Sequence, residues 1–151
     1  MPPFLKLPDQ AAYRAHYERT LCRGGIITHD GIPVFFNKKT FDHAFFESSD
    51  RRGAKDKFSL ERAMRMDWIP AALADPNAEC FQGWDRKKKY HDPTRRVAVV
   101  VDDFVIVIGI SLNRRGKLKA NFITCYRADN SIERIRQSPP WSLQECLNAL
   151  R

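Results

Sequence analysis

One stretch of the chain combines hydroxyl groups with a positive charge in a pattern that suits phosphate chemistry. Residues 119–126 read Lys-Ala-Asn-Phe-Ile-Thr-Cys-Tyr, and Arg127 follows directly. Phe, Ile, Thr and Tyr favour β-strands, whose side chains alternate between two faces. Alternation predicts one polar face made of Phe122, Thr124 and Tyr126, and one apolar core face made of Ile123 and Cys125. Thr and Tyr are also ordinary strand residues, so this stretch alone leaves a purely structural role open.

His43 is the histidine best placed for acid–base chemistry. Thr40 can cap a predicted helix over 40–48, whose core face is formed by Phe41, Ala44 and Phe45 at helical spacing. His43 lies off that stripe and points sideways. It can exchange a proton near neutral pH, which neither hydroxyl does easily. The alternative is a half-buried helix histidine hydrogen-bonded to Glu47, one turn later.

Metal-free cleavage of RNA needs this set of groups. RNA supplies its own nucleophile, the 2′-OH, so the protein must supply a general base, a general acid and cations that stabilise the charged transition state. His43 can be the base or the acid, and Thr124 and Tyr126 can orient or protonate the phosphate. Phosphate-binding cations are expected at three positions: Lys57, Arg62 and Arg127.

Other reaction classes lack their motifs in this sequence. It contains no Walker loop, dinucleotide glycine pattern, nucleophile elbow or zincin motif. The four cysteines form no Cys-x-x-Cys pair and the histidines show no metal-ligand spacing, so we expect neither a metal nor a cofactor. No apolar run could span a bilayer and the N-terminus does not resemble a secretory signal, which predicts a cytoplasmic protein without membrane contacts.

The charge of the chain favours a polyanionic partner. Its 151 residues include 26 Lys and Arg against 18 Asp and Glu, a net charge of +8. Strongly basic small domains usually bind nucleic acid, although a generally basic solvated surface is the alternative. Nucleic-acid contacts are expected, besides Arg127, at Arg86, Lys87, Lys88, Lys89, Arg95 and Arg96. Further cation clusters occur at Arg51-Arg52, Lys55 with Lys57, Arg114-Arg115 and Arg134 with Arg136.

The helices that must position these residues are predicted mainly in the N-terminal half. A short helix follows Asp9, and Asp30-Gly31 marks a hairpin turn. Ser59 caps a helix that runs to about Trp68, and Pro70 separates it from a second helical piece over 70–74.

Strands dominate the second half. They are predicted over 80–84, 96–101, 104–112 and 119–127, and 104–112 should be central because it is apolar on both sides. Residues 132–136 are expected to be helical. Ser142 and Glu145 form a capping box for a final helix. The order predicts an α+β fold: N-terminal helices packed on an antiparallel sheet of about four strands, with a short C-terminal helix.

Several segments together resemble a known group of nucleases. They are 41–45, 57–63, 68–69, 73–76, 122–127 and 135–141, together with the Val-rich strand before Asp102. In this order and spacing, over roughly 36–141, they resemble the phage-associated and toxin-like nucleases of the barnase–EndoU–colicin–RelE-like superfamily. The resemblance implies helices on one face of a four-stranded antiparallel sheet, an RNA cleft on the other and metal-independent endoribonuclease activity. It assigns the site to His43, Lys57, Arg62, Thr124 and Tyr126.

These observations predict one domain over 1–151, with an N-terminal helix and hairpin (8–36), a nuclease core (37–141) and a C-terminal helix (142–150). The leading hypothesis is a metal-independent endoribonuclease that cleaves RNA, such as tRNA or mRNA, by transesterification at the 2′-OH. It would act as a toxin or as an effector carried by a phage or plasmid, with an antitoxin or immunity protein as partner. Two alternatives use the same basic surface: a non-catalytic RNA- or DNA-binding module, and a module that binds an acidic protein. Catalysis needs His43 specifically, whereas binding depends on the summed charge.

Overall fold

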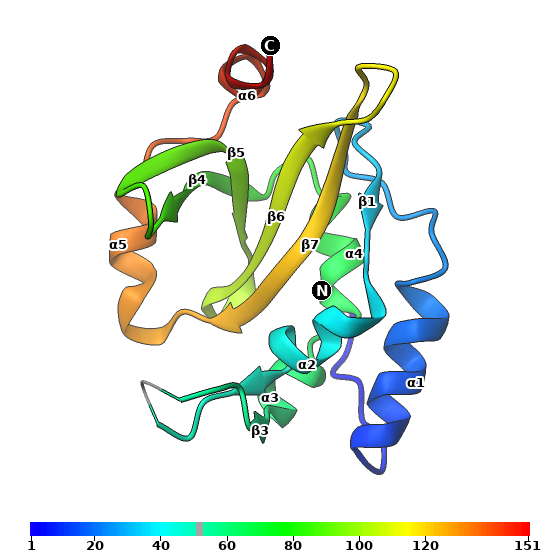
Figure 1. Ribbon diagram of the computed structural model, residues 1–151. Helices are drawn as coiled ribbons and strands as arrows, with labels where there is room; N and C mark the ends of the chain where they lie inside the picture. Colours follow the sequence, from blue (N-terminus) through cyan, green and yellow to red (C-terminus); the bar gives the residue numbers. More distant parts are fainter. Residues whose placement is uncertain (51–52) are drawn as a thin grey trace.

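A five-stranded mixed sheet forms the centre of the structure, a computed structural model that describes residues 1–50 and 53–151 (Figure 1). The strand order is β1-β7-β6-β5-β4. Four strands form an antiparallel meander: β4 (Glu79–Asp85), β5 (Tyr90–Val99), β6 (Phe104–Leu112) and β7 (Leu118–Arg127). The short strand β1 (Val34–Phe35) runs parallel to β7 at one edge. The predicted antiparallel strands are therefore present, with β1 as an addition.

The helices and a small second sheet surround this central sheet. The helices are α1 (Gln10–Thr20), α2 (Phe41–Ala44), α3 (Leu60–Ala63), α4 (Trp68–Leu73), α5 (Ile132–Arg136) and α6 (Leu143–Leu150). The second sheet pairs β2 (Phe46–Glu47) with β3 (Lys57–Phe58). The fold is thus α+β, as predicted. No helix among the described residues has the length and apolar character needed to cross a membrane.

The two faces of the central sheet carry separate apolar cores. The larger core packs α1, α2, α3 and α4 against one face, which presents Ile106 and Ile108 of β6. The smaller core packs α5 against the other face, through Ile132 and the partly buried Ile135. Figure 1 shows α5 on the side of the sheet away from α1 and α4. Because α5 covers only part of its face, the rest of that face is left for a cleft.

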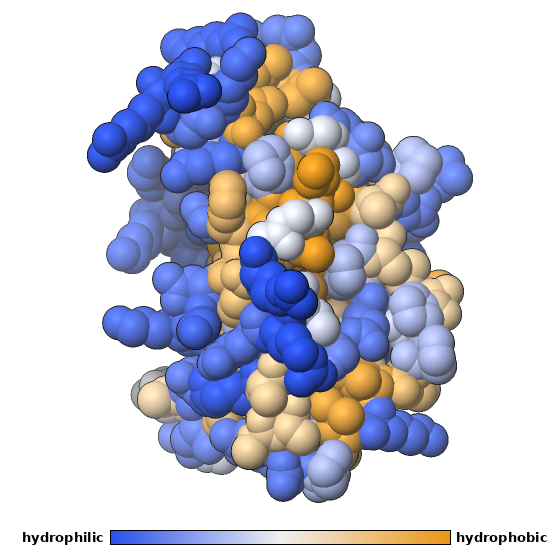
Figure 2. Space-filling view, turned by 90° about the vertical axis from the view of Figure 1, so that its right-hand side faces the viewer, coloured by the Kyte–Doolittle hydropathy of each residue, from blue (hydrophilic) through white to orange (hydrophobic). Residues whose placement is uncertain are grey.

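The described residues form no continuous apolar face on the side that carries α1 and β1. Hydrophobic residues there form patches between hydrophilic ones (Figure 2). Two exposed apolar side chains belong to the segment that leads into and forms β1, Ile27 and Phe35.

Three helix predictions are wrong in their bounds. The helix expected from Ser59 to about Trp68 ends at Ala63, and residues 64–67 form turns before α4. The helix expected over 40–48 ends at Ala44, because the next residues enter strand β2 and pair with β3. Thr40 makes no capping hydrogen bond, whereas the side chain of Asn37 accepts one from the backbone N–H of Lys39. Helix α4 begins at Trp68 rather than at Pro70. Proline fits there because a first-turn N–H has no partner within the helix.

The capping predictions for the other helices are confirmed. The side chains of Asp9, Ser59 and Ser142 each accept a backbone hydrogen bond from the first turn of the helix that follows. The predicted helix over 132–136 has the same bounds as α5. The turn between β5 and β6 contains Asp102 and Asp103 at φ 58° and 56°. Asp tolerates this left-handed conformation better than most residues, which suits a tight hairpin turn.

Candidate active site

A cleft of about 1060 Å³ lies over the sheet face that α5 only partly covers. Its floor is made of strand residues, Val97, Val107, Ile123, Thr124 and Tyr126. One wall is α5 with the residues around it, and another is the β4–β5 hairpin. His43, Lys55 and Arg62 line the cleft from the α2 and α3 side. Residues from most of the length of the chain therefore meet at one hollow.

A β-bulge in β7 decides which side chains reach this cleft. Val107 pairs with Thr124, and the next residue of β6 pairs with Phe122, so Ile123 is an extra residue. Phe122 and Cys125 both belong to the larger core, while Ile123 lines the cleft. The predicted faces of Phe122 and Ile123 are therefore wrong, because regular alternation stops at the bulge. Thr124 and Tyr126 share a surface as predicted.

His43 reaches the cleft because its helix is fixed by its neighbours. Phe41, Ala44 and Phe45 are all fully buried, as predicted, which leaves His43 on an outer side of α2. Glu47 is not its partner: the Glu47 carboxylate accepts a hydrogen bond from Ser59 Oγ at 3.2 Å. Within the described part of the chain, no side chain is hydrogen-bonded to the imidazole of His43, which is therefore free to exchange a proton with a ligand.

The surroundings of His43 favour its neutral form. Partial burial lowers the pKa of His43 below the 6.5 of an ordinary histidine, and the positive charges of Lys55 and Arg62 lower it further. Most His43 side chains are therefore neutral at pH 7. A neutral imidazole can accept a proton, which is the role of a general base.

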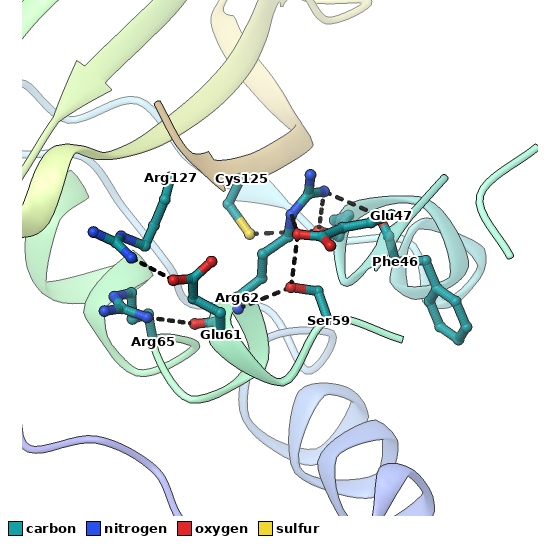
Figure 3. A network of polar contacts seen from close by, with 9 residues as sticks. Phe46, Glu47, Ser59, Glu61, Arg62, Arg65, Cys125 and Arg127 are labelled. Atoms are coloured by element: carbon teal, nitrogen blue, oxygen red, sulfur yellow. Dashed lines mark hydrogen bonds and ion pairs between the residues drawn. The ribbon is translucent and has the colours of Figure 1, made fainter. Parts of the chain in front are cut away.

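Arg62 is held in place by the backbone of the segment that carries His43. Its Nη1 donates to the carbonyl oxygens of Ala44 and Phe46 at 3.2 and 3.0 Å (Figure 3). The Glu47 carboxylate lies 3.8 Å from Arg62 Nε. The guanidinium carbon lies 6.0 Å from the centre of the Tyr126 ring. Arg62 therefore places a fixed positive charge near both His43 and Tyr126.

Tyr126 remains a proton donor in this setting. Burial raises the pKa of its phenol above 10, and the charges of Arg62 and Arg86 only partly oppose that effect. The O–H group is therefore kept at neutral pH. Thr124 adds a second hydroxyl to the same cleft floor. The two hydroxyls can donate hydrogen bonds to a bound anion.

The cleft is strongly basic. Among the described residues, its lining includes no carboxylate and five cationic side chains: Lys55, Arg62, Arg86, Arg95 and Arg134. Gly83 helps to place one of them, because a Cβ there would lie 2.4 Å from the side-chain carbons of Arg95. The aliphatic part of Arg95 thus lies directly on the backbone of β4, and its Nη1 donates to Trp84 O at 3.3 Å. Such a lining attracts polyanions.

Several predicted site residues lie elsewhere. Lys57 is exposed on β3 and does not line the cleft, since the alternation of this strand turns Phe58 towards the core instead. Lys55, two residues earlier in the sequence, lines the cleft in place of Lys57. Arg127 is hydrogen-bonded to Glu61 of α3 and lies outside the cleft (Figure 3). Lys87, Lys88 and Lys89 form the exposed turn of the β4–β5 hairpin, beside the cleft rather than in it.

Arg96 is not available to nucleic acid in this structure. Its side chain is 1% exposed and points to the face opposite Arg95. Arg96 Nη1 donates to both carboxylate oxygens of Asp30, at 3.1 and 3.2 Å. Its guanidinium carbon lies 4.9 Å from the centre of the Trp141 ring. The prediction of a phosphate contact at Arg96 is therefore corrected to a structural role.

Arg51 and Arg52, another predicted cluster, lie outside the described residues.

Sequence reasoning missed part of the lining. Trp84, His91, Ser131, Gln137 and Ser138 line the cleft but were not expected there. The sequence marked Lys55 and Arg134 only by their positive charge, as members of cation clusters. A second, more open groove of about 540 Å³ shares His43 and Ile123 with the cleft. A long ligand could therefore extend to both sides of His43.

The loss of one cleft cation would test whether the cleft is the RNA-binding surface. Replacing Arg86 with Gln should lower the slope of log affinity for single-stranded RNA against log salt by about 0.7, the value for one lost phosphate contact. Arg127→Gln removes the same charge outside the cleft and should leave the slope unchanged. The measurement is a salt titration of binding. A reduced slope for Arg127→Gln alone would place the binding surface on the α3 side.

No cluster suited to a metal ion is present among the described residues, where no three His, Cys, Asp or Glu side chains are grouped for one. Comparison of the chain with protein-family models, with curated proteins and with solved structures found no match.

Proposed function

We propose that the chain is a metal-independent endoribonuclease whose active site is the basic cleft. The observation that carries the proposal is that His43, Arg62, Thr124 and Tyr126, from three separate segments, meet in one hollow. Its lining, within the described part of the chain, includes cations and no carboxylates. The sequence resemblance to toxin-like nucleases assigns these four residues to the site, together with Lys57, which does not line the cleft. A toxin or a phage- or plasmid-borne effector is the corresponding biological role.

The proposed reaction begins with proton removal from the 2′-OH of the substrate by neutral His43. The 2′-oxygen attacks the adjacent phosphorus, and the P–O5′ bond breaks. Tyr126 donates a proton to the leaving 5′-oxygen, and the proton gained by His43 returns to the phenolate through solvent. The products are a 2′,3′-cyclic phosphate and a 5′-hydroxyl, so atoms and charges balance. No water is consumed in this step.

The cations stabilise the charge that develops on the phosphorus centre. Arg62 is the strongest candidate, because two backbone carbonyls and Glu47 hold its guanidinium in place before substrate binds. Burial lowers the pKa of Lys55, and the positive charges of Arg62 and Arg86 lower it further, partly opposed by the carboxylate of Glu47. A bound phosphate would relieve the mutual repulsion of these groups. The site is therefore expected to bind an anion more tightly than a neutral analogue.

The pH dependence tests the assigned protonation states. For kcat/KM on RNA in excess chelator, activity should fall on the acidic side with an inflection below pH 6.5, because the lowered pKa of His43 keeps it neutral until then. The alkaline limb should lie above pH 10, where Tyr126 loses its proton. The products, resolved by mass, should carry 2′,3′-cyclic phosphate ends. Activity that is lost in chelator and restored by one divalent ion would contradict the mechanism.

A further inference from the structure

Trp84 differs from the other two tryptophans of the chain. The indole N–H groups of Trp68 and Trp141 donate to backbone carbonyls, of Pro2 at 2.7 Å and of Pro93 at 2.9 Å. Both rings thereby have partners that explain them as structural residues. Trp84 is 49% exposed, and among the described residues its indole N–H has no partner. Its packing alone therefore does not account for a tryptophan at this position.

Trp84 lies in the cleft rather than on the outer surface of its hairpin. It is paired across the strands with His91, and both line the cleft together with Arg86 and Arg95. The centres of the Trp84 and His91 rings lie 5.0 Å apart at an interplanar angle of 71°, an edge-to-face contact. This contact braces the indole from one side. Within the described residues no other ring stacks on Trp84, so a further flat group can do so.

Aromatic rings between cations are the elements with which proteins bind single-stranded nucleic acid. The cations follow the phosphates, and the rings stack on bases. Bases in a duplex are already stacked on their neighbours, so only an unpaired base can offer its face to an exposed indole. A single-stranded RNA whose phosphates contact Arg86 and Arg95 would bring its bases to Trp84.

We propose that Trp84 is a stacking site for an unpaired base, and that the cleft therefore selects single-stranded over duplex RNA. The inference rests on the proposed function for the identity of the ligand, and it adds the substrate class. His91 is a positioning residue that supports the indole edge-on. The stacking site and His43 line the same cleft, so one bound strand can contact both.

The test measures binding separately from cleavage. The probe is a short mixed-sequence RNA in which every 2′-OH is methylated, so that it lacks the nucleophile, used single-stranded and annealed to its complement. Trp84→Ala should weaken single-strand affinity about ten-fold or more. Trp84→Phe should keep most of the affinity, and Trp84→Leu, which keeps apolar bulk without a ring face, should not. Duplex affinity should be the same in parent and Trp84→Ala.

Tyr90→Ala is the matched control. Tyr90 is an exposed aromatic residue of the same hairpin, but it pairs with Asp85 and does not line the cleft. Its loss should leave single-strand affinity unchanged, and thermal melts of all variants check the fold. Because Trp84→Ala removes no charge, the salt dependence of binding should also be unchanged.

Two results would overturn the stacking site: unchanged single-strand affinity in Trp84→Ala and Trp84→Leu, or an equal loss for single strand and duplex. Cleavage of unmodified RNA is assayed in parallel. A parent protein that binds the single strand through Trp84 but cleaves no RNA would reject the ribonuclease proposal while supporting the stacking site. If the parent cleaves RNA and Trp84→Ala cleaves and binds equally well, the stacking site is rejected and the ribonuclease proposal is supported.

Discussion

Replacing His43 with Ala should slow RNA cleavage on the order of a hundred-fold or more, the usual contribution of a general base or acid. The imidazole lines the cleft, has no hydrogen-bond partner among the described residues and is kept neutral by partial burial and two nearby cations. His91, the other histidine in the cleft lining, instead packs edge-to-face against Trp84. The measurement is the initial rate of cleavage of a mixed RNA pool in chelator, compared with the parent.

The fold and the affinity for RNA should survive this substitution. The buried side of α2 is formed by Phe41, Ala44 and Phe45, and the five cleft cations remain. His29→Ala is the control, because His29 is exposed and lies outside the cleft. Tyr126→Phe should also slow cleavage, since it removes the proposed proton donor while keeping the ring. If His43→Ala cleaves as fast as the parent, the cleft is a binding site and not an active site.

The parts of the fold that were predicted correctly are those set by local pattern. Residues 104–112 are apolar on both sides, and they form the central strand β6 with the predicted bounds. Phe41, Ala44 and Phe45 face the core because helical spacing brings them together even in a helix of one turn. Capping by Ser59 and Ser142 also depends only on neighbours in sequence.

The errors arise where a distant partner overrides the local pattern. The bulge at Ile123 is a property of the pairing between β7 and β6, and the sequence around it reads as a regular strand. Strands β2 and β3 have two residues each and exist only because they pair with each other, so the early end of α2 had no local signal. That pairing also decides that Lys57 faces outward.

Arg96 illustrates the same limit for the site. Beside Arg95 it reads as part of a surface cation cluster, and strand alternation alone places one of the two on each face. Which face is buried depends on Asp30, 66 positions earlier, and on Trp141. The rigid segment before Trp141 is held against β4, where Gln82 N donates to Pro139 O at 2.8 Å. A buried cation of this kind is visible only in three dimensions.

Replacing Asp30 with Asn should destabilise the fold by about 3 kcal/mol, the lower end of the range for leaving a buried charge without its partner, because the side chain of Arg96 is 1% exposed and that of Asp30 is 21% exposed. Asp30 is the only carboxylate bonded to Arg96 among the described residues, and Arg96 Nε has no hydrogen-bond partner there. Asn has nearly the same shape as Asp and can still accept from Thr28 Oγ1, which lies 2.6 Å from Asp30 Oδ1. The loss therefore reports the uncompensated charge. Denaturant unfolding at pH 7 measures it.

The pair also predicts how stability depends on acid. Burial acts to raise the pKa of Asp30, but the hydrogen bond from Thr28 and the charge of Arg96 outweigh it, so the pKa lies below its usual 3.8. A carboxyl with a depressed folded-state pKa stabilises the protein above its unfolded value, and that contribution is lost as pH falls from 3.8 through the folded value. The parent should therefore lose more stability than Asp30→Asn between pH 5 and pH 2.

A matched surface pair and a double variant separate charge pairing from other effects. Asp42 is ion-paired with Arg14 at the surface, so Asp42→Asn should cost well under 1 kcal/mol. In Asp30→Asn combined with Arg96→Met, the buried charge is gone and an apolar side chain fills its place, so much of the lost stability should return. If the double variant is less stable than Asp30→Asn alone, Arg96 stabilises the fold mainly through its contact with Trp141. The pairing with Asp30 would then contribute little to stability, because the guanidinium of Arg96 would stabilise the fold even without a counter-charge.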